Sequence, residues 1–141
     1  MTLLHYAEAK AARDRAEVTS DPDGAFSVAL TSPTALGGAG GEGASPEQLF
    51  ATGYSACFLS TLRFVAGQHR IALAPLSSVT ATMGIGRRGD DKGFGLDVAL
   101  SVSLPEVAPD VVHALLEQAH IVCPYSHLAR NGMPVRVALA D

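Results

Sequence analysis

Residues 45–58 read SPEQLFATGYSACF, and this stretch decides the fold because it marks the start of a long apolar helix. Ser45 suits the N-cap, Pro46 suits the first helical position, and Gln48 completes a capping box with Ser45. The apolar residues that follow predict a helix that runs to about Ala66. One of the chain's two cysteines, Cys57, lies inside it.

A second predicted helix begins at Pro109 and ends at Cys123, because a residue that precedes a proline, here Pro124, disfavours helical angles. Its inner stripe is predicted to comprise Val112, Leu115, Leu116, Ala119 and Val122.

Alternating apolar residues predict strands in four places. The first strand spans residues 25–30 and follows a turn at 21–24. The next two span 79–85 and 94–104 and are joined by a polar hairpin loop at 86–93. The last is a short strand with Val135, Val137 and Leu139. Together with the two helices, this order predicts one α+β domain over residues 1–141, with antiparallel sheet and two buried helices.

The composition excludes several classes of protein. The chain has 141 residues, 48% hydrophobic and 17% charged, with a net charge of −4 and scattered basic residues, so a nucleic-acid-binding surface is not expected. The N-terminal residues lack the pattern of a signal peptide, and the apolar run 49–62 is too short to span a bilayer. We therefore expect a cytoplasmic protein that does not bind membranes.

Cys57 and Cys123 each lie on the buried side of a predicted helix, and neither belongs to a CxxC motif. Such thiols are either inert core residues or a working redox pair. In a reducing compartment, any disulfide between them would be transient and functional.

Two further motifs suggest ligand-binding sites, but the sequence around each of them argues against such a site. Residues 38–43 read GAGGEG and match GxGxxG, but no strand leads directly into them, and the acidic residue expected about 20 positions later falls near Arg63. A flexible loop is favoured over a nucleotide site. His120, Cys123 and His127 have spacings of three and four that would suit zinc, but Pro124 separates the last two, and no metal is expected.

Glu47 lies at the second position of the first helix, where its carboxylate interacts favourably with the helix dipole. It could equally anchor an arginine from elsewhere, and Arg13 and Arg15 are the candidates. The residues alone leave this choice open.

Residues 46–58 (PEQLFATGYSACF) and 119–126 (AHIVCPYS) resemble the organic hydroperoxide resistance (Ohr) branch of the OsmC superfamily. The resemblance covers nearly the whole chain and includes residues 36–41, 84–86 and 93–96. It implies an OsmC-like fold, with antiparallel sheets packed around two central helices, in an intertwined homodimer. It also implies a thiol peroxidase that reduces organic hydroperoxides, including those of fatty acids, to alcohols.

The resemblance assigns roles residue by residue. Cys57 matches the peroxidatic cysteine, Cys123 the resolving cysteine and Glu47 the family's glutamate. The family's arginine follows a glycine pair that is replaced here by two alanines, which makes Arg13 the choice and Arg15 its rival. The family carries no bound cofactor, and lipoyl groups on protein carriers supply the external dithiol that recycles it.

After Ser126 the residues HLARNG (127–132) depart from the family pattern. Arg130 still aligns, and His127 is given no role.

Helix geometry adds one expectation. Glu47 and Cys57 would be about 15 Å apart along a continuous helix, too far for an arginine paired with Glu47 to reach Cys57 of the same helix. Either Gly53 breaks the helix, or the arginine and glutamate come from a second subunit, which we favour. The apolar residues around Cys57 would select bulky peroxides. The alternative is an OsmC-type ligand-binding or sensing protein whose buried thiols are not catalytic.

Overall fold

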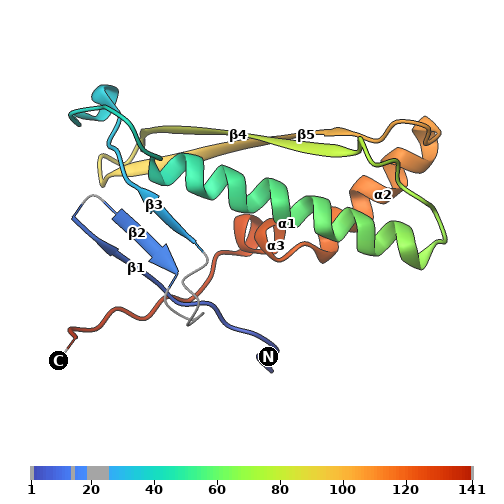
Figure 1. Ribbon diagram of the computed structural model, residues 1–141, viewed down its shortest axis with the longest axis horizontal. Helices are drawn as coiled ribbons and strands as arrows, with labels where there is room; N and C mark the ends of the chain where they lie inside the picture. The colour runs from blue at the N-terminus through green and yellow to red at the C-terminus, as the bar shows by residue number, and fades with distance from the viewer. Residues whose placement is uncertain (1, 14, 19–25, 141) are drawn as a thin grey trace. The chain divides into compact units, whose positions relative to one another are not determined.

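The computed structural model describes residues 2–13, 15–18 and 26–140 of the chain. Its elements follow the order β1, β2, β3, a short 3-10 helix, α1, β4, β5, α2 and α3 (Figure 1). The chain divides into two compact units, Met1–Phe50 and Ala51–Asp141, and α1 crosses the boundary between them. The α+β class predicted from the sequence is confirmed.

The first unit holds a three-stranded antiparallel sheet in the order β1-β2-β3. Only β3 was predicted, within residues 25–30, because β1 and β2 consist largely of alanine and charged residues with no apolar alternation. The turn predicted at 21–24 lies outside the described residues. The strands span Ala9–Ala12 (β1), Arg15–Val18 (β2) and Ser27–Ala29 (β3), and the 3-10 helix spans Thr34–Leu36.

The glycine-rich loop at 37–43 folds back on the residues before it. The backbone N–H of Gly40 donates to the carbonyl of Ser32 at 3.0 Å. A Cβ atom at Gly38 would lie 2.2 Å from the same carbonyl oxygen, so only glycine fits there. Backbone hydrogen bonds to the preceding residues thus hold the loop, and the N–H of Gly40 already has the carbonyl of Ser32 as its acceptor.

Helix α1 (Pro46–Gln68) begins with the predicted capping box. The hydroxyl oxygen of Ser45 accepts the Gln48 N–H at 3.2 Å, and Gln48 Oε1 accepts the Ser45 N–H at 2.7 Å. The helix continues slightly past its predicted end without interruption. A break at Gly53, one of the two alternatives from the sequence, is therefore wrong.

By length and composition alone, α1 is long and apolar enough to cross a membrane. This is weak evidence, because the core helix of a soluble protein passes the same test. One face of α1 is buried, as in a core helix, and includes Tyr54, Phe58, Leu62, Val65 and Ala66.

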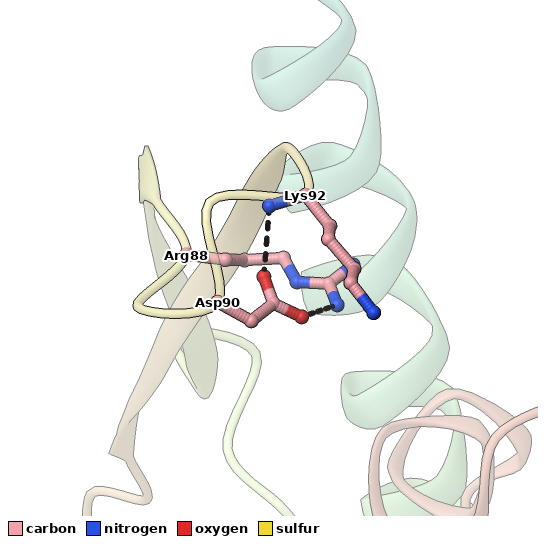
Figure 2. Close-up of polar contacts among 3 residues, drawn as sticks. All are labelled: Arg88, Asp90 and Lys92. Carbon is pink, nitrogen blue, oxygen red and sulfur yellow. Dashed lines mark hydrogen bonds and ion pairs between the residues drawn. The ribbon is translucent and has the colours of Figure 1, made fainter.

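In the second unit, β4 (Ser78–Arg87) and β5 (Phe94–Ser103) form one long antiparallel hairpin. Figure 1 shows the hairpin running alongside α1. Both strands were predicted, at 79–85 and 94–104, because their alternation is regular. In the connecting loop the carboxylate of Asp90 pairs with Arg88 and accepts the backbone N–H of Lys92 at 3.1 Å (Figure 2).

Two helices complete the second unit. α2 (Pro109–Val122) ends where predicted, and Leu115 and Ala119 of its inner stripe are buried. Val122 was expected in that stripe but is 48% exposed. α3 (Pro124–Asn131) was not predicted, because Pro124 both ends α2 and occupies the first position of α3.

The strand predicted around Val135, Val137 and Leu139 is wrong for the described chain. Residues 133–140 carry no regular secondary structure, and these three side chains are exposed. Their alternation suits a strand, but a strand also needs an edge with which to pair.

Candidate active site

The structure brings together the two cysteines that the sequence singled out. Cys57 lies on α1, Cys123 lies at the junction of α2 and α3, and their sulfur atoms are 3.6 Å apart. Cys57 is half-buried, whereas Cys123 is completely buried. The two thiols are in contact, close enough to form a disulfide after a small movement.

The position of Cys123 follows from the backbone at the helix junction. Its dihedral angles are extended (φ −63°, ψ 123°), so it serves as the C-cap of α2 and the N-cap of α3. Its N–H donates to the Ala119 carbonyl at 2.8 Å, and its own carbonyl accepts the His127 N–H at 2.9 Å. Both helix ends therefore fix this residue.

A buried pair of hydroxyl groups lies beside the thiols. Tyr54 Oη and Ser126 Oγ are 2.9 Å apart, and both residues are buried. The ring of Tyr54 also packs against that of Tyr125, with centroids 5.7 Å apart. Gly53 leaves room for this ring, since a Cβ atom there would lie 3.1 Å from Tyr125 Oη. These contacts join α3 to α1.

The two thiols differ in their acidity. Burial raises the pKa of the Cys57 thiol. The hydrogen bond between Cys57 and Cys123 and the charge on Cys123 raise this pKa further, whereas a hydrogen bond from the backbone N–H of Tyr125 lowers it. Burial acts in the same direction at Cys123. The effect of burial is outweighed by hydrogen bonds to the Cys123 sulfur, and the pKa of Cys123 is lowered. The donors are the backbone N–H and the hydroxyl of Ser126, the Cys57 thiol and the backbone N–H of Tyr125.

A guanidinium brought close to Cys57 would lower the pKa of this thiol. Within the described chain, the pKa of Cys57 is shifted in the opposite direction. Cys123 therefore ionises first when the chain is considered alone.

The structure places the other two candidate residues in the first unit. Arg13 is exposed at the turn between β1 and β2, with a φ of 56°. Glu47 Oε2 is buried and has no hydrogen-bond partner among the described residues. A buried carboxylate oxygen of this kind calls for a cation or a donor. The side chain of Arg15, the rival of Arg13, lies outside the described part of the chain, and the choice stays a prediction.

The alternative zinc site finds no support in the side-chain positions. Across residues 2–13, 15–18 and 26–140, no three His, Cys, Asp or Glu side chains gather closely enough to hold a metal ion. His120 and His127 are both exposed. The His120 carbonyl, in the last turn of α2, accepts a hydrogen bond from Arg130. The His127 ring contacts the side chain of Asn131, the last residue of α3.

A cavity of about 380 Å³ lies in the second unit, bordered by α1, β5, α2 and α3. Tyr54 and Phe58, which flank Cys57 in the sequence, line one side of it. Its other lining residues are Val98, Leu100, Val102, Leu116, His120 and Ala129. Most of this lining is apolar.

The family model described as OsmC-like protein matches residues 38–138. The chain belongs to the OsmC-like family. Within it, the chain falls in the Ohr branch, as the motifs around both cysteines predicted.

Relatives of similar length carry the name of that branch. An organic hydroperoxide resistance protein from Xanthomonas axonopodis pv. citri is 38% identical over 138 residues, which cover 98% of this chain and 96% of the relative. The crystal structure of an organic hydroperoxide resistance protein from Elizabethkingia anophelis matches with a TM-score of 0.82 at 40% identity, covering 93% of this chain and 92% of that one. The OsmC-like fold is thus confirmed.

A putative organic hydroperoxide resistance protein from Vibrio cholerae, solved with captopril bound in one of its active sites, matches with a TM-score of 0.81 at 34% identity, covering 93% of this chain and 88% of that one.

The sequence assigned no role to Tyr125 and Ser126, and Tyr54 was expected only as one of the apolar residues around Cys57. All three lie inside the two motifs that carried the resemblance, GYSACF and VCPYS.

Proposed function

We propose that this OsmC-like protein is a thiol peroxidase that reduces organic hydroperoxides, including those of fatty acids, to alcohols. The observation that carries the proposal is the 3.6 Å contact between the sulfurs of Cys57 and Cys123. The name organic hydroperoxide resistance protein, borne by its relatives, supports the same substrate class.

The reaction proceeds in two steps. The Cys57 thiolate attacks the O–O bond of the peroxide, becomes a sulfenic acid, and releases an alkoxide that takes up a proton to give the alcohol. The Cys123 sulfur then attacks the Cys57 sulfur, and hydroxide leaves as water after taking up a proton. The resulting disulfide requires the sulfurs to approach to about 2.05 Å, which side-chain rotation can supply.

The first step needs a positive charge near Cys57, because burial raises the pKa of this thiol. The proposed source is Arg13, held in place by the carboxylate of Glu47. The Oε2 atom of Glu47 supports this pairing, because it is buried and has no hydrogen-bond partner in the part of the chain that the structure describes.

The uninterrupted α1 helix supports a contribution from a second subunit. Glu47 and Cys57 are about 15 Å apart along it, so a guanidinium bound to Glu47 cannot also contact Cys57 of the same helix, and the proposal assigns that contact to Cys57 of another subunit. The proposed working unit is therefore a homodimer with two composite sites.

Apolar surroundings would favour bulky peroxides. Removal of apolar surface from water contributes about 25 cal/mol per Å², which an alkyl chain gains and hydrogen peroxide does not. The cavity lined by Tyr54 and Phe58 offers such a surface near the Cys57 segment. Selectivity should therefore increase with the length of the alkyl chain.

Recycling requires an external dithiol, and a lipoyl group on a protein carrier is the proposed one. No tightly bound cofactor takes part in the proposed cycle. A reducing compartment such as the cytoplasm suits a disulfide that forms and breaks in every turnover.

Turnover of cumene hydroperoxide with dihydrolipoamide tests the proposal. The Cys57→Ser variant should lose turnover, because the attacking thiolate is absent. The Cys123→Ser variant should complete a single turnover and then become inactive, as excess peroxide drives Cys57 to sulfinic acid. Mass spectrometry of the wild-type protein after one equivalent of peroxide should show the disulfide. Retained turnover in Cys57→Ser would reject the assignment.

The second candidate function is a ligand-binding or sensing protein, favoured by the apolar cavity of about 380 Å³. In that case both the wild-type protein and Cys57→Ser would bind a fatty acid equally well, and neither would consume peroxide. Calorimetric titration with the fatty acid, run beside the turnover assay, separates the two functions.

A further inference from the structure

We infer that the hydroxyl groups of Ser126 and Tyr54 stabilise Cys123 as a leaving thiolate, so that an external dithiol attacks the Cys57 sulfur of the oxidised protein. The inference rests on the proposed function and concerns the reductive half of its cycle. It assigns a direction to the exchange, makes Ser126 the group that holds the leaving sulfur, and makes Tyr54 a positioning residue that acts through Ser126.

Access to the two sulfurs favours this direction. Thiol–disulfide exchange requires the incoming thiolate to reach the sulfur that it attacks. Cys123 has no exposed surface, whereas Cys57 is half-buried on α1. Of the two sulfurs, Cys57 is therefore the one that an external thiol can approach.

The hydrogen-bond arrangement around Cys123 supports its departure as an anion. A hydroxyl group has one proton to donate. If Ser126 donates its proton to the Cys123 sulfur, then Tyr54 must be the donor in the 2.9 Å contact between the two hydroxyls. The Tyr54 proton then points to the Ser126 oxygen and the Ser126 proton to the thiolate, which gives the buried tyrosine hydroxyl a partner.

The acidity of the leaving thiol agrees with this arrangement. The donors at the start of α3 outweigh the effect of burial and lower the pKa of Cys123. In an exchange reaction, the thiol with the lower pKa leaves faster.

The exchange balances without a further reactant. One thiolate of the carrier dithiol bonds to the Cys57 sulfur, the Cys57–Cys123 bond breaks, and its electron pair remains on Cys123. The carrier's second thiolate then attacks the carrier sulfur of this mixed disulfide and releases the Cys57 thiolate. The carrier leaves as a cyclic disulfide, oxidised by the two electrons that the protein disulfide gains.

The direction of attack can be read from a trapped intermediate. The disulfide is formed with diamide, which requires no peroxidase activity, and is then mixed briefly with 2-mercaptoethanol, quenched with acid and alkylated. Peptide mapping should find the mercaptoethanol adduct on Cys57 and the alkyl group on Cys123. An adduct on Cys123, or failure of diamide to join the two cysteines, would overturn the inference. If peroxide turnover fails while this pattern holds, only the proposed function is lost.

The role of the hydroxyls is tested with conservative variants. Ser126→Ala should slow dihydrolipoamide reduction of the diamide-formed disulfide about tenfold, because one hydrogen bond to a charged group is lost. Tyr54→Phe should slow the same reduction about threefold. In a Cys57→Ser background, ultraviolet titration of the Cys123 thiolate should shift to higher pH in both variants. Such a shift separates a role at the sulfur from a general loss of stability.

Ser77→Ala is the matched control. Ser77 is a buried serine whose hydroxyl has no partner within the described chain, so the same atom is lost away from the thiols. Its reduction rate and its titration should match those of the wild-type protein. Ser126→Ala and Tyr54→Phe rates equal to that of Ser77→Ala would remove the two hydroxyls from the mechanism.

Discussion

At the scale of single residues, the chemistry depends on what surrounds each sulfur. Donors at the start of α3 favour a thiolate at Cys123, while Cys57 on α1 has its pKa raised by burial. A peroxidatic Cys57 therefore depends on a cation supplied to it, and the two arginines near the N-terminus are the candidates. Their different backbone positions, at a turn and in β2, make them separable.

Single alanine variants decide between these arginines. Arg13→Ala is expected to slow the oxidation of Cys57 by cumene hydroperoxide about thirtyfold, because without a guanidinium only a few per cent of the thiol is ionised. Arg15→Ala should stay within about twofold, because the proposal assigns the cation at Cys57 to Arg13. Rapid-mixing oxidation, repeated as a function of pH, gives both values. The reverse ranking would reassign the role to Arg15, and no effect in either variant would contradict the cation requirement.

At the scale of elements, α1 and α3 meet where Gly53 lies against the ring of Tyr125, and two glycines of α1 allow a matched test. Gly67→Ala should raise the free energy of unfolding by about 0.5 kcal/mol, since alanine favours a helix and the space there is open. At Gly53 the new Cβ would lie 3.1 Å from Tyr125 Oη and 3.3 Å from Cε2. Displacement of this ring should make Gly53→Ala destabilising by about 1 kcal/mol. Urea denaturation measures the free energy of unfolding of both variants. Equal changes in the two variants would show that the Tyr125 ring can move away from a Cβ atom at position 53 at no cost.

The same elements show which parts of the fold a sequence determines locally. The Ser45–Gln48 capping box and the regular alternation of β4 and β5 involve neighbouring residues, so these elements were predicted correctly. β1 and β2 lack apolar alternation, and Pro124 is read as a terminator although it also starts α3. The segment at 133–140 alternates but pairs with no strand among the described residues.

The site was predictable only in part, for a related reason. The contact between Cys57 and Cys123 joins residues 66 positions apart, and periodicity cannot indicate such a pairing. The motif resemblance supplied it. The lowered pKa of Cys123 depends on donors at the start of α3, a helix that the sequence did not predict, so the acidity of this thiol could not be predicted either.

At the scale of the whole molecule, several large apolar side chains are exposed on the chain, including Leu4, Val137 and Leu139 at 97%, 93% and 98%. Where such side chains gather into a contiguous patch, a partner commonly covers it. If the proposed homodimer is the working unit, light scattering of the purified protein should give twice the mass of one chain. A fully active monomer would contradict the homodimer.

A composite site makes a sharper prediction, because two inactive chains should repair each other. In a heterodimer of Cys57→Ser and Arg13→Ala, one site combines Cys57 of one chain with Arg13 of the other and is intact. Random mixing of equal amounts should restore about a quarter of the wild-type sites, since half of the dimers are mixed and each holds one intact site. The peroxidase assay after joint refolding measures this recovery. A mixture of Cys57→Ser with Cys57→Ser/Arg13→Ala has no intact site and serves as the control. If the Arg13–Glu47 pair acts on Cys57 of its own chain, mixing restores nothing, and the subunits work independently.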